Sequence, residues 1–131
     1  MSNKLHFIVI DDSKLDCFIA EKVIQNTGRN ESVRSFMMAS EALDYLRQAS
    51  QAELKTVILV DIQMPLMNGF EFLDEFEKMI PEDARNRFVV NLLSSSINET
   101  DMTRARSYKT VHMFLNKPLT KASLEEALMS T

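Results

Sequence analysis

The chain has 131 residues, of which 45% are hydrophobic and 26% are charged, a length and composition that suit one globular domain and exclude a disordered or fibrous chain. Its 15 Lys and Arg residues against 19 Asp and Glu residues give a net charge of −4, which argues against a general nucleic-acid binder. The single cysteine, Cys17, excludes an internal disulfide, and no apolar run approaches the roughly 18 residues that span a membrane. We therefore expect a cytoplasmic protein that binds neither nucleic acid nor a membrane directly.

Apolar runs alternate with helical patterns along the whole chain. In chain order, the patterns predict strand 5–10, helix 13–26, strand 33–37, helix 39–49, strand 56–60, helix 70–80, strand 88–93, helix 99–108, strand 111–115 and helix 120–129. Three of these strands are almost continuously apolar, which is typical of strands buried on both faces. The alternation therefore predicts an α/β fold in which helices cover a doubly wound parallel sheet.

The first and fourth expected helices differ in their apolar content. In helix 13–26, the residues at helical spacing that we expect to face inward are Leu15, Phe18, Ile19 and Val23. Helix 99–108 is the least apolar, with Met102 and Ala105 as its main inward candidates. Weak packing suits an element that shifts between two arrangements.

Polar residues stand at the ends of four expected strands. Asp11 and Asp12 end the first strand, and Asp61 ends the third. Three serines, 94–96, end the fourth strand, and a Lys-Pro pair, 117–118, follows the fifth. Taken singly, such residues are often helix caps, polar turns or loop residues. Their joint occurrence indicates a site, because the carboxyl ends of parallel strands meet at one edge of a sheet.

This combination of side chains suits phosphoryl chemistry. Three carboxylates close together repel one another and raise one another's pKa values. A hard divalent cation removes the conflict, and Mg²⁺ prefers oxygen ligands from one or two carboxylates together with phosphate oxygens. A lysine can serve as a point charge for a carboxylate or phosphate, and a carboxylate can act as the nucleophile.

Four stretches resemble the receiver domain of bacterial two-component response regulators, of the stand-alone chemotaxis-regulator type. These stretches are IVIDDS (8–13), ILVDIQMPLMNG (58–69), LLSSS (92–96) and FLNKPL (114–119). The resemblance covers essentially the whole chain. It implies a flavodoxin-like fold with five helices and a five-stranded parallel sheet in the order 2-1-3-4-5, as one receiver domain over 1–131 without an output domain.

The resemblance also implies roles for the acidic residues. Asp61 would be the phospho-acceptor. Asp11 and Asp12 would hold Mg²⁺ together with Asp61 and the backbone carbonyl of Gln63. Asn68 stands where the family more often has Asp, and either residue suits a turn before glycine.

The remaining implied roles concern the phosphate and its readout. Lys117 would contact the acyl phosphate, and its bond to Pro118 would be cis. Ser94 takes the place of the family's switch Thr or Ser, without the methyl group of Thr. Phe114 takes the place of the switch aromatic residue.

The function implied is that of a stand-alone response regulator. It would accept a phosphoryl group from a sensor histidine kinase or a histidine phosphotransfer protein and then change its protein-binding surface toward a downstream protein target. It would be a monomer or weak homodimer, and no enzyme beyond Mg²⁺-dependent self-phosphorylation and slow autodephosphorylation.

Three alternatives remain at this stage. A phosphorelay intermediate would pass the phosphate on to a histidine phosphotransfer protein. A hydrolase with an aspartyl-phosphate intermediate usually carries a second acid two residues after the nucleophile, but Gln63 occupies that position. A scaffold that no longer takes phosphate would not need the acid pair, Asp61 and Lys117.

Overall fold

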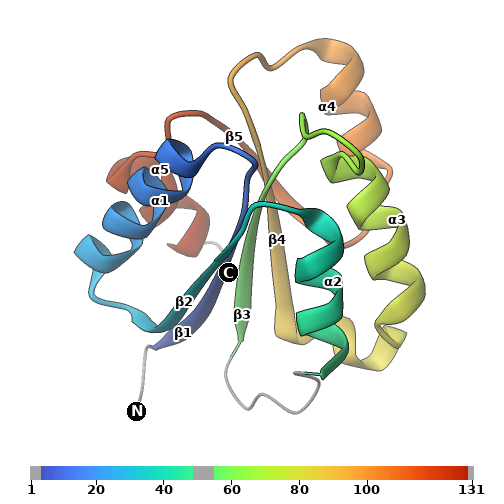
Figure 1. Cartoon of the computed structure of the whole chain (residues 1–131), viewed down its shortest axis with the longest axis horizontal. Helices are drawn as coiled ribbons and strands as arrows, with labels where there is room; N and C mark the ends of the chain where they lie inside the picture. The colour runs from blue at the N-terminus through green and yellow to red at the C-terminus, as the bar shows by residue number, and fades with distance from the viewer. Residues whose placement is uncertain (1–3, 49–54, 130–131) are drawn as a thin grey trace.

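The computed structural model describes residues 4–48 and 55–129. Its elements are β1 (Leu5–Ile10), α1 (Lys14–Thr27), β2 (Asn30–Phe36), α2 (Ala39–Gln48), β3 (Thr56–Asp61), α3 (Gly69–Met79), the 3₁₀ helix η1 (Glu82–Arg87), β4 (Phe88–Ser94), α4 (Glu99–Arg106), β5 (Val111–Asn116) and α5 (Lys121–Met129). The strands form one sheet in the order β2-β1-β3-β4-β5, with every neighbouring pair parallel (Figure 1). The predicted doubly wound fold and its strand order are therefore confirmed.

The sheet lies between two layers of helices (Figure 1). Helices α1 and α5 cover one face, and α2, α3 and α4 cover the other. Alternate residues of one strand serve the two layers: in β1, Phe7 and Val9 pack toward α1 and α5, whereas Ile8 and Ile10 pack toward α2 and α3. This double burial explains why the central strands are continuously apolar instead of alternating.

Helix α1 buries a different stripe from the one that its apolar residues predict. The buried residues are Cys17, Ala20 and Ile24, whereas Leu15 is 66% exposed and Phe18 is 55% exposed. Both stripes have helical spacing, so periodicity alone does not choose between them. The smaller side chains face the sheet, and the prediction that Leu15 and Phe18 face inward is wrong.

Several boundaries also differ from the predicted ones. Strand β2 begins at Asn30 instead of Val33, because this edge strand is only half-buried and tolerates polar residues. Residues 82–87 form η1, which the sequence analysis did not predict, and α4 ends at Arg106 instead of residue 108. Position 49, the predicted end of the second helix, lies outside the described residues.

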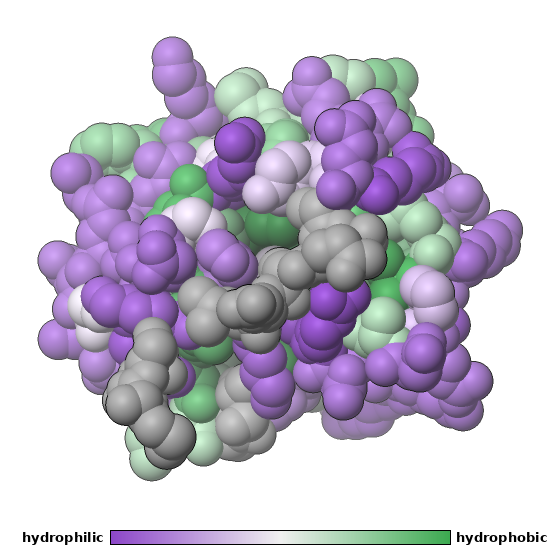
Figure 2. Space-filling model, turned by 90° about the horizontal axis from the view of Figure 1, so that it is seen from below, coloured by the Kyte–Doolittle hydropathy of each residue, from purple (hydrophilic) through white to green (hydrophobic). Residues whose placement is uncertain are grey.

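The end of the molecule at which the strands begin is polar. Seen from the amino ends of the strands, the described residues present mainly hydrophilic side chains (Figure 2). The clustered acids and the lysine expected from the sequence lie at the opposite, carboxyl end of the sheet. The loops that follow the strands therefore hold the candidate site.

One core position on β4 departs from the apolar pattern. Asn91 is fully buried, and neither its Oδ1 nor its Nδ2 has a hydrogen-bond partner among the described residues. Its neighbours at i−2 and i+2, Val89 and Leu93, belong to the layer under α1 and α5. The amide therefore lies in an apolar layer, and an unpaired buried polar group destabilises a fold by about 1–3 kcal/mol.

We expect Asn91→Leu to raise the free energy of unfolding by about 1–2 kcal/mol, because the side chains have similar volumes and leucine needs no hydrogen bond. Urea unfolding followed by circular dichroism would measure the change. The control, Asn91→Ala, also removes the amide but leaves a cavity, so its gain should be smaller or absent. A less stable Asn91→Leu protein would contradict this account of the amide.

Candidate functional site

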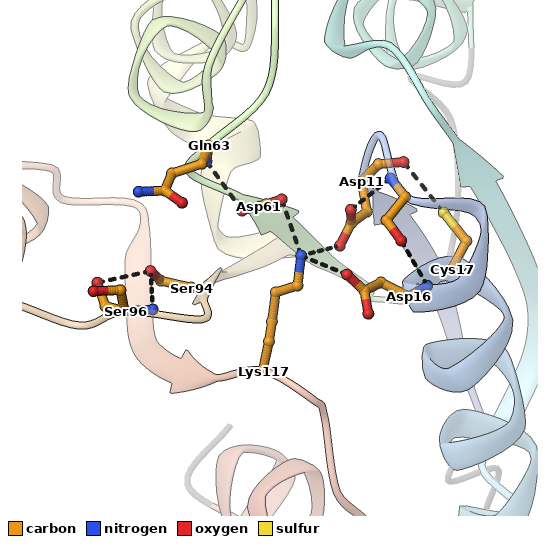
Figure 3. A network of polar contacts seen from close by, with 9 residues as sticks. Asp11, Asp16, Cys17, Asp61, Gln63, Ser94, Ser96 and Lys117 are labelled. Atoms are coloured by element: carbon orange, nitrogen blue, oxygen red, sulfur yellow. Dashed lines mark hydrogen bonds and ion pairs between the residues drawn. The ribbon is translucent and has the colours of Figure 1, made fainter.

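The carboxyl ends of the strands bring the predicted polar residues to one rim of the sheet. Asp11 follows β1 directly, Asp61 is the last residue of β3, and Lys117 follows β5. The first two side chains are buried, with 0% and 4% of their residue surface exposed, whereas Asp12 is exposed. Figure 3 shows the lysine side chain reaching from β5 toward both buried acids.

Three carboxylates form a compact acidic group. Ligand atoms of Asp11, Asp12 and Asp61 all lie within 4.8 Å of one another. Asp11 Oδ2 is buried, and among the described residues its polar contact is the ammonium of Lys117 at 2.9 Å. Buried or clustered carboxylate oxygens are the donors that a hard divalent cation prefers. The residues present therefore fit a metal ion of that kind.

Lys117 balances the charge of the rim. Its Nζ lies 2.9 Å from Asp11 Oδ2, 3.0 Å from Asp61 Oδ2 and 2.8 Å from Asp16 Oδ2, while 12% of its side chain is exposed (Figure 3). Burial by itself would lower the pKa of the ammonium, but hydrogen bonds and charges from these carboxylates outweigh it and hold that pKa above its ordinary value. The lysine is thus a fixed positive charge.

The carboxyl group of Asp11 is buried away from water. Burial raises the pKa of its carboxyl group, although the Ser13 N–H, 2.9 Å from Oδ1, and the Lys117 ammonium both lower it. The neighbouring Asp61 charge adds to the increase. An acid whose pKa is raised by folding destabilises the folded state when it is ionised, so stability falls as the pH rises through its titration.

We therefore expect Asp11→Asn to be more stable than the parent at pH 7 without divalent cations, by on the order of 1 kcal/mol. The asparagine oxygen can still accept from Ser13 N–H, and Lys117 keeps two carboxylates. The gain should shrink as the pH falls through the raised pKa of folded Asp11 toward its ordinary value near 4, and it should be absent below that, where Asp11 is protonated in both states. Urea unfolding across this pH range measures it; a gain that persists at low pH would contradict the electrostatic cause.

The acceptor candidate Asp61 is held by its own loop. Its Oδ1 accepts a hydrogen bond of 3.0 Å from the backbone N–H of Gln63, and its Oδ2 accepts one from Lys117. The loop then closes where Gly69 N–H donates to Ile62 O at 3.2 Å. At Gly69 there is no room for a side chain, because a Cβ would lie 2.7 Å from the backbone oxygen of Asp61.

The loop ends in a well-formed helix start. Asn68 is the N-cap of α3, where its Oδ1 accepts from Glu71 N–H at 2.9 Å. Glu71 Oε1 accepts in turn from Asn68 N–H at 3.0 Å, which completes a capping box. Asparagine at this position thus serves as a helix cap, so its difference from the commoner Asp leaves the geometry of the loop intact.

The hydroxyl of Ser94 belongs to the rim but does not contact the acids. Ser94 is fully buried at the end of β4. Its Oγ donates to Ser96 O and accepts from Ser96 N–H, both at 3.0 Å, on the side of Lys117 away from Asp11 (Figure 3). The structure therefore places this predicted residue beside the site, in an arrangement turned toward its own loop.

Phe114 lies within β5, before the strand end that forms the rim. It is half-buried on β5 and packs against the core under α2, α3 and α4. It also lines a groove of about 420 Å³ between α4 and β5, together with Met102, Ala105 and Tyr108. Of the two inward candidates on α4, Ala105 is buried and Met102 is half-buried. An open groove beside the ring leaves room for Phe114 to change its position.

A family model adds what geometry alone does not give. The model described as the response regulator receiver domain matches residues 7–129. The chain belongs to this family. The sequence resemblance to two-component receiver domains is thereby confirmed, and the peptide bond between Lys117 and Pro118 is cis, as that resemblance implies.

Individual relatives agree with this assignment. A response regulator receiver protein from Dyadobacter fermentans DSM 18053 is 38% identical, with 96% of each chain covered and a TM-score of 0.85. A probable methanogenesis regulatory protein, FilR2, from Methanothrix harundinacea (strain 6Ac) is 23% identical over 92% of this chain and 77% of its own length. Hybrid signal transduction histidine kinase L of Dictyostelium discoideum is 24% identical, but the receiver chain spans only 7% of its length.

Sequence reasoning missed one member of the receiver site. Asp16, from the first turn of α1, lies 2.8 Å from Lys117 Nζ. The available signal was the spacing Ser13-x-x-Asp16, which marks a helix start and places an acid one turn after the first strand. Ser13 is the N-cap of α1, since its Oγ accepts from Asp16 N–H at 3.2 Å.

No helix among the described residues is long and apolar enough to cross a lipid bilayer.

Proposed function

We propose that this receiver domain accepts a phosphoryl group on Asp61, from the phosphohistidine of a sensor histidine kinase or a histidine phosphotransfer protein, in a Mg²⁺-dependent reaction. The observation that supports this most directly is the meeting of Asp61 with Asp11, Asp12 and Lys117 at one rim. An Asp61 oxygen forms the new bond to phosphorus as the phosphorus–nitrogen bond of the donor breaks. The domain has no other catalytic activity than this transfer and slow hydrolysis of the product.

Different residues would hold the metal ion and supply the second positive charge. Asp11, Asp12, Asp61 and the Gln63 carbonyl would hold Mg²⁺, which supplies positive charge to the phosphoryl oxygens. Lys117 would supply a second positive charge, because its ammonium already lies 3.0 Å from Asp61 Oδ2. The buried position of Asp61 limits the access of water, so that the acyl phosphate persists for long enough to signal.

Labelling with a small phosphodonor tests this function. Incubation with acetyl phosphate and Mg²⁺ should add one phosphate per chain by intact mass spectrometry, and alkaline treatment should remove it. Addition of EDTA before the phosphodonor should prevent the labelling. Labelling that persists in EDTA would contradict a role for the divalent cation, and its absence under all conditions would contradict the proposal as a whole.

The output is proposed to pass through the surface that α4 and β5 form. Ser94 would leave Ser96 for the phosphoryl group, and Phe114 would move into the space beside it. Only contacts that differ between the two states can shift this equilibrium. The groove between α4 and β5 and the single buried residue of α4, Ala105, support a mobile element at this place.

Chemical-shift mapping with and without beryllofluoride, a phosphate mimic, tests the output. Amide signals of residues 97–108 and 113–116 should move in the parent. Ser94→Ala should still accept phosphate from acetyl phosphate but lose most of these remote shifts. Changes confined to the loops around Asp11, Asp61 and Lys117 would favour the phosphorelay function, for which transfer to a purified histidine phosphotransfer protein is the direct assay. For either function we propose a cytoplasmic domain that binds protein partners. We propose that it is a monomer or weak homodimer.

A further inference from the structure

Asp16 occupies a position whose usual partner is already taken. It is the third residue of α1, and Ser13 is the N-cap. In a complete capping box the acid at this position accepts from the N–H of the cap residue, as Glu71 does for Asn68 in α3. In α1, however, Ser13 N–H donates to Asp11 Oδ1 instead. The Asp16 carboxylate is therefore available for another partner, and it lies 2.8 Å from Lys117 Nζ.

The ammonium of Lys117 contacts two of the acids that a metal ion would need. Two of its three carboxylate partners, Asp11 and Asp61, belong to the acidic group that could hold a cation, and it contacts Oδ2 of both. Asp16 is not a member of that group. A divalent cation and Lys117 therefore compete for the same two acids, and Asp16 is the partner that the cation does not claim.

Displacing Lys117 from both acids costs free energy, and the cost depends on whether the ammonium keeps another carboxylate partner. Only 12% of the lysine side chain is exposed, so an ammonium without a carboxylate would be poorly solvated there. Asp16, with 28% of its side chain exposed, stands at the outer edge of the site and already touches the same nitrogen. Retaining this contact lets Lys117 give up the other two without being left unpaired.

We propose that Asp16 is a positioning residue that retains Lys117 when Mg²⁺ binds Asp11 and Asp61, and thereby increases the affinity for the metal. This inference rests on the proposed function, because it presupposes that Mg²⁺ binds at the acidic group. An ammonium has three N–H groups. One can stay on Asp16 while the others face the phosphoryl oxygens, so the same contact keeps the lysine beside the acceptor.

The test is a Mg²⁺ titration of the full chain followed by amide chemical shifts. Asp16→Asn should bind Mg²⁺ about five-fold more weakly than the parent, or worse. The matched control is Glu21→Gln, which removes the same charge from the same helix. The Glu21 carboxylate accepts a hydrogen bond from the Ser35 hydroxyl instead of contacting Lys117. This control should change the affinity by less than about two-fold. Equal affinities of Asp16→Asn and the parent would overturn the proposal.

A second pair of variants separates positioning from simple loss of negative charge. In a Lys117→Met background there is no ammonium to retain, so Asp16→Asn should no longer weaken Mg²⁺ binding. Asp16→Glu, which keeps the carboxylate, should restore most of the parent affinity. An Asp16→Asn effect of the same size with and without Lys117 would overturn the proposal in favour of a long-range charge effect.

One readout needs no substitution of Lys117, in case that variant does not fold. In the Mg²⁺-saturated parent the ¹Hε and ¹³Cε signals of Lys117 should stay distinct from those of exposed lysines, and in Asp16→Asn they should move toward them. Unchanged Lys117 signals would overturn the proposal. If the parent itself binds no Mg²⁺, the proposed function fails together with this inference, whereas Mg²⁺ binding that ignores Asp16 overturns this inference alone.

Discussion

Asp61→Asn is expected to lower phosphate incorporation from acetyl phosphate by at least about 100-fold, because an amide oxygen lacks the charge of the attacking carboxylate. The asparagine keeps the shape of the side chain and an oxygen that can accept from Gln63 N–H, so the loop should survive. Intact mass spectrometry with Mg²⁺ present measures the labelled fraction.

The matched control for this substitution is Asp44→Asn. Asp44 is an exposed acid on α2 that pairs with Arg47 at 2.7 Å and is not part of the acidic group. This variant should label as well as the parent. If Asp61→Asn were labelled to the same extent as Asp44→Asn, another residue would be the acceptor and the assignment of Asp61 would be wrong.

Gly69→Ala is expected to lower the free energy of unfolding by about 2–4 kcal/mol. The new Cβ would lie 2.7 Å from the oxygen of Asp61 and 2.8 Å from the Cα of Ile62. Both atoms belong to the backbone, so no flexible side chain can move aside. Relief of the clash must shift the end of β3 and with it the acceptor, so labelling should become slower in addition to the loss of stability.

Gly28→Ala provides the comparison. Gly28 ends α1 with φ of +70°, and a Cβ there meets no atom within 4 Å. The substitution should cost only about 1–2 kcal/mol of backbone strain and leave labelling unchanged. Chemical denaturation and the acetyl phosphate assay on both variants make the comparison. A Gly69→Ala protein as stable as the parent would contradict the tight closure of the acceptor loop.

The sequence located the acids and the lysine because each stands at the end of an expected strand, and the strands before Asp11 and Asp61 are strongly apolar. For Asp11, Asp61 and Lys117, the parallel sheet converts a position along the chain into a position at the rim. No side-chain geometry was needed for that step. The same logic placed Ser94 at the end of β4, but only the structure reveals that its hydroxyl is bonded to Ser96.

The sequence did not predict which face of a helix is buried, or which of two possible acceptors a backbone N–H would bind. Two stripes of α1 satisfy helical spacing, and the one with Cys17 and Ala20 is buried because the small residues face the sheet. Asp16 lies in the first turn of α1, and its carboxylate is free to contact Lys117 because the N–H of the cap residue Ser13 donates to Asp11 instead. Local patterns do not contain such tertiary competition.

Two hydrogen bonds between the Ser94 hydroxyl and Ser96 would limit how often the unphosphorylated domain adopts the active arrangement. If Ser94 is the proposed switch, it must break both bonds before it can imitate the phosphorylated state. At about 0.5–1.5 kcal/mol each, their loss makes spontaneous excursions rarer by roughly 5- to 150-fold. Under the proposed function, the bonded resting state would therefore suppress background output in the absence of a stimulus, and the new contact with phosphate would have to outweigh it.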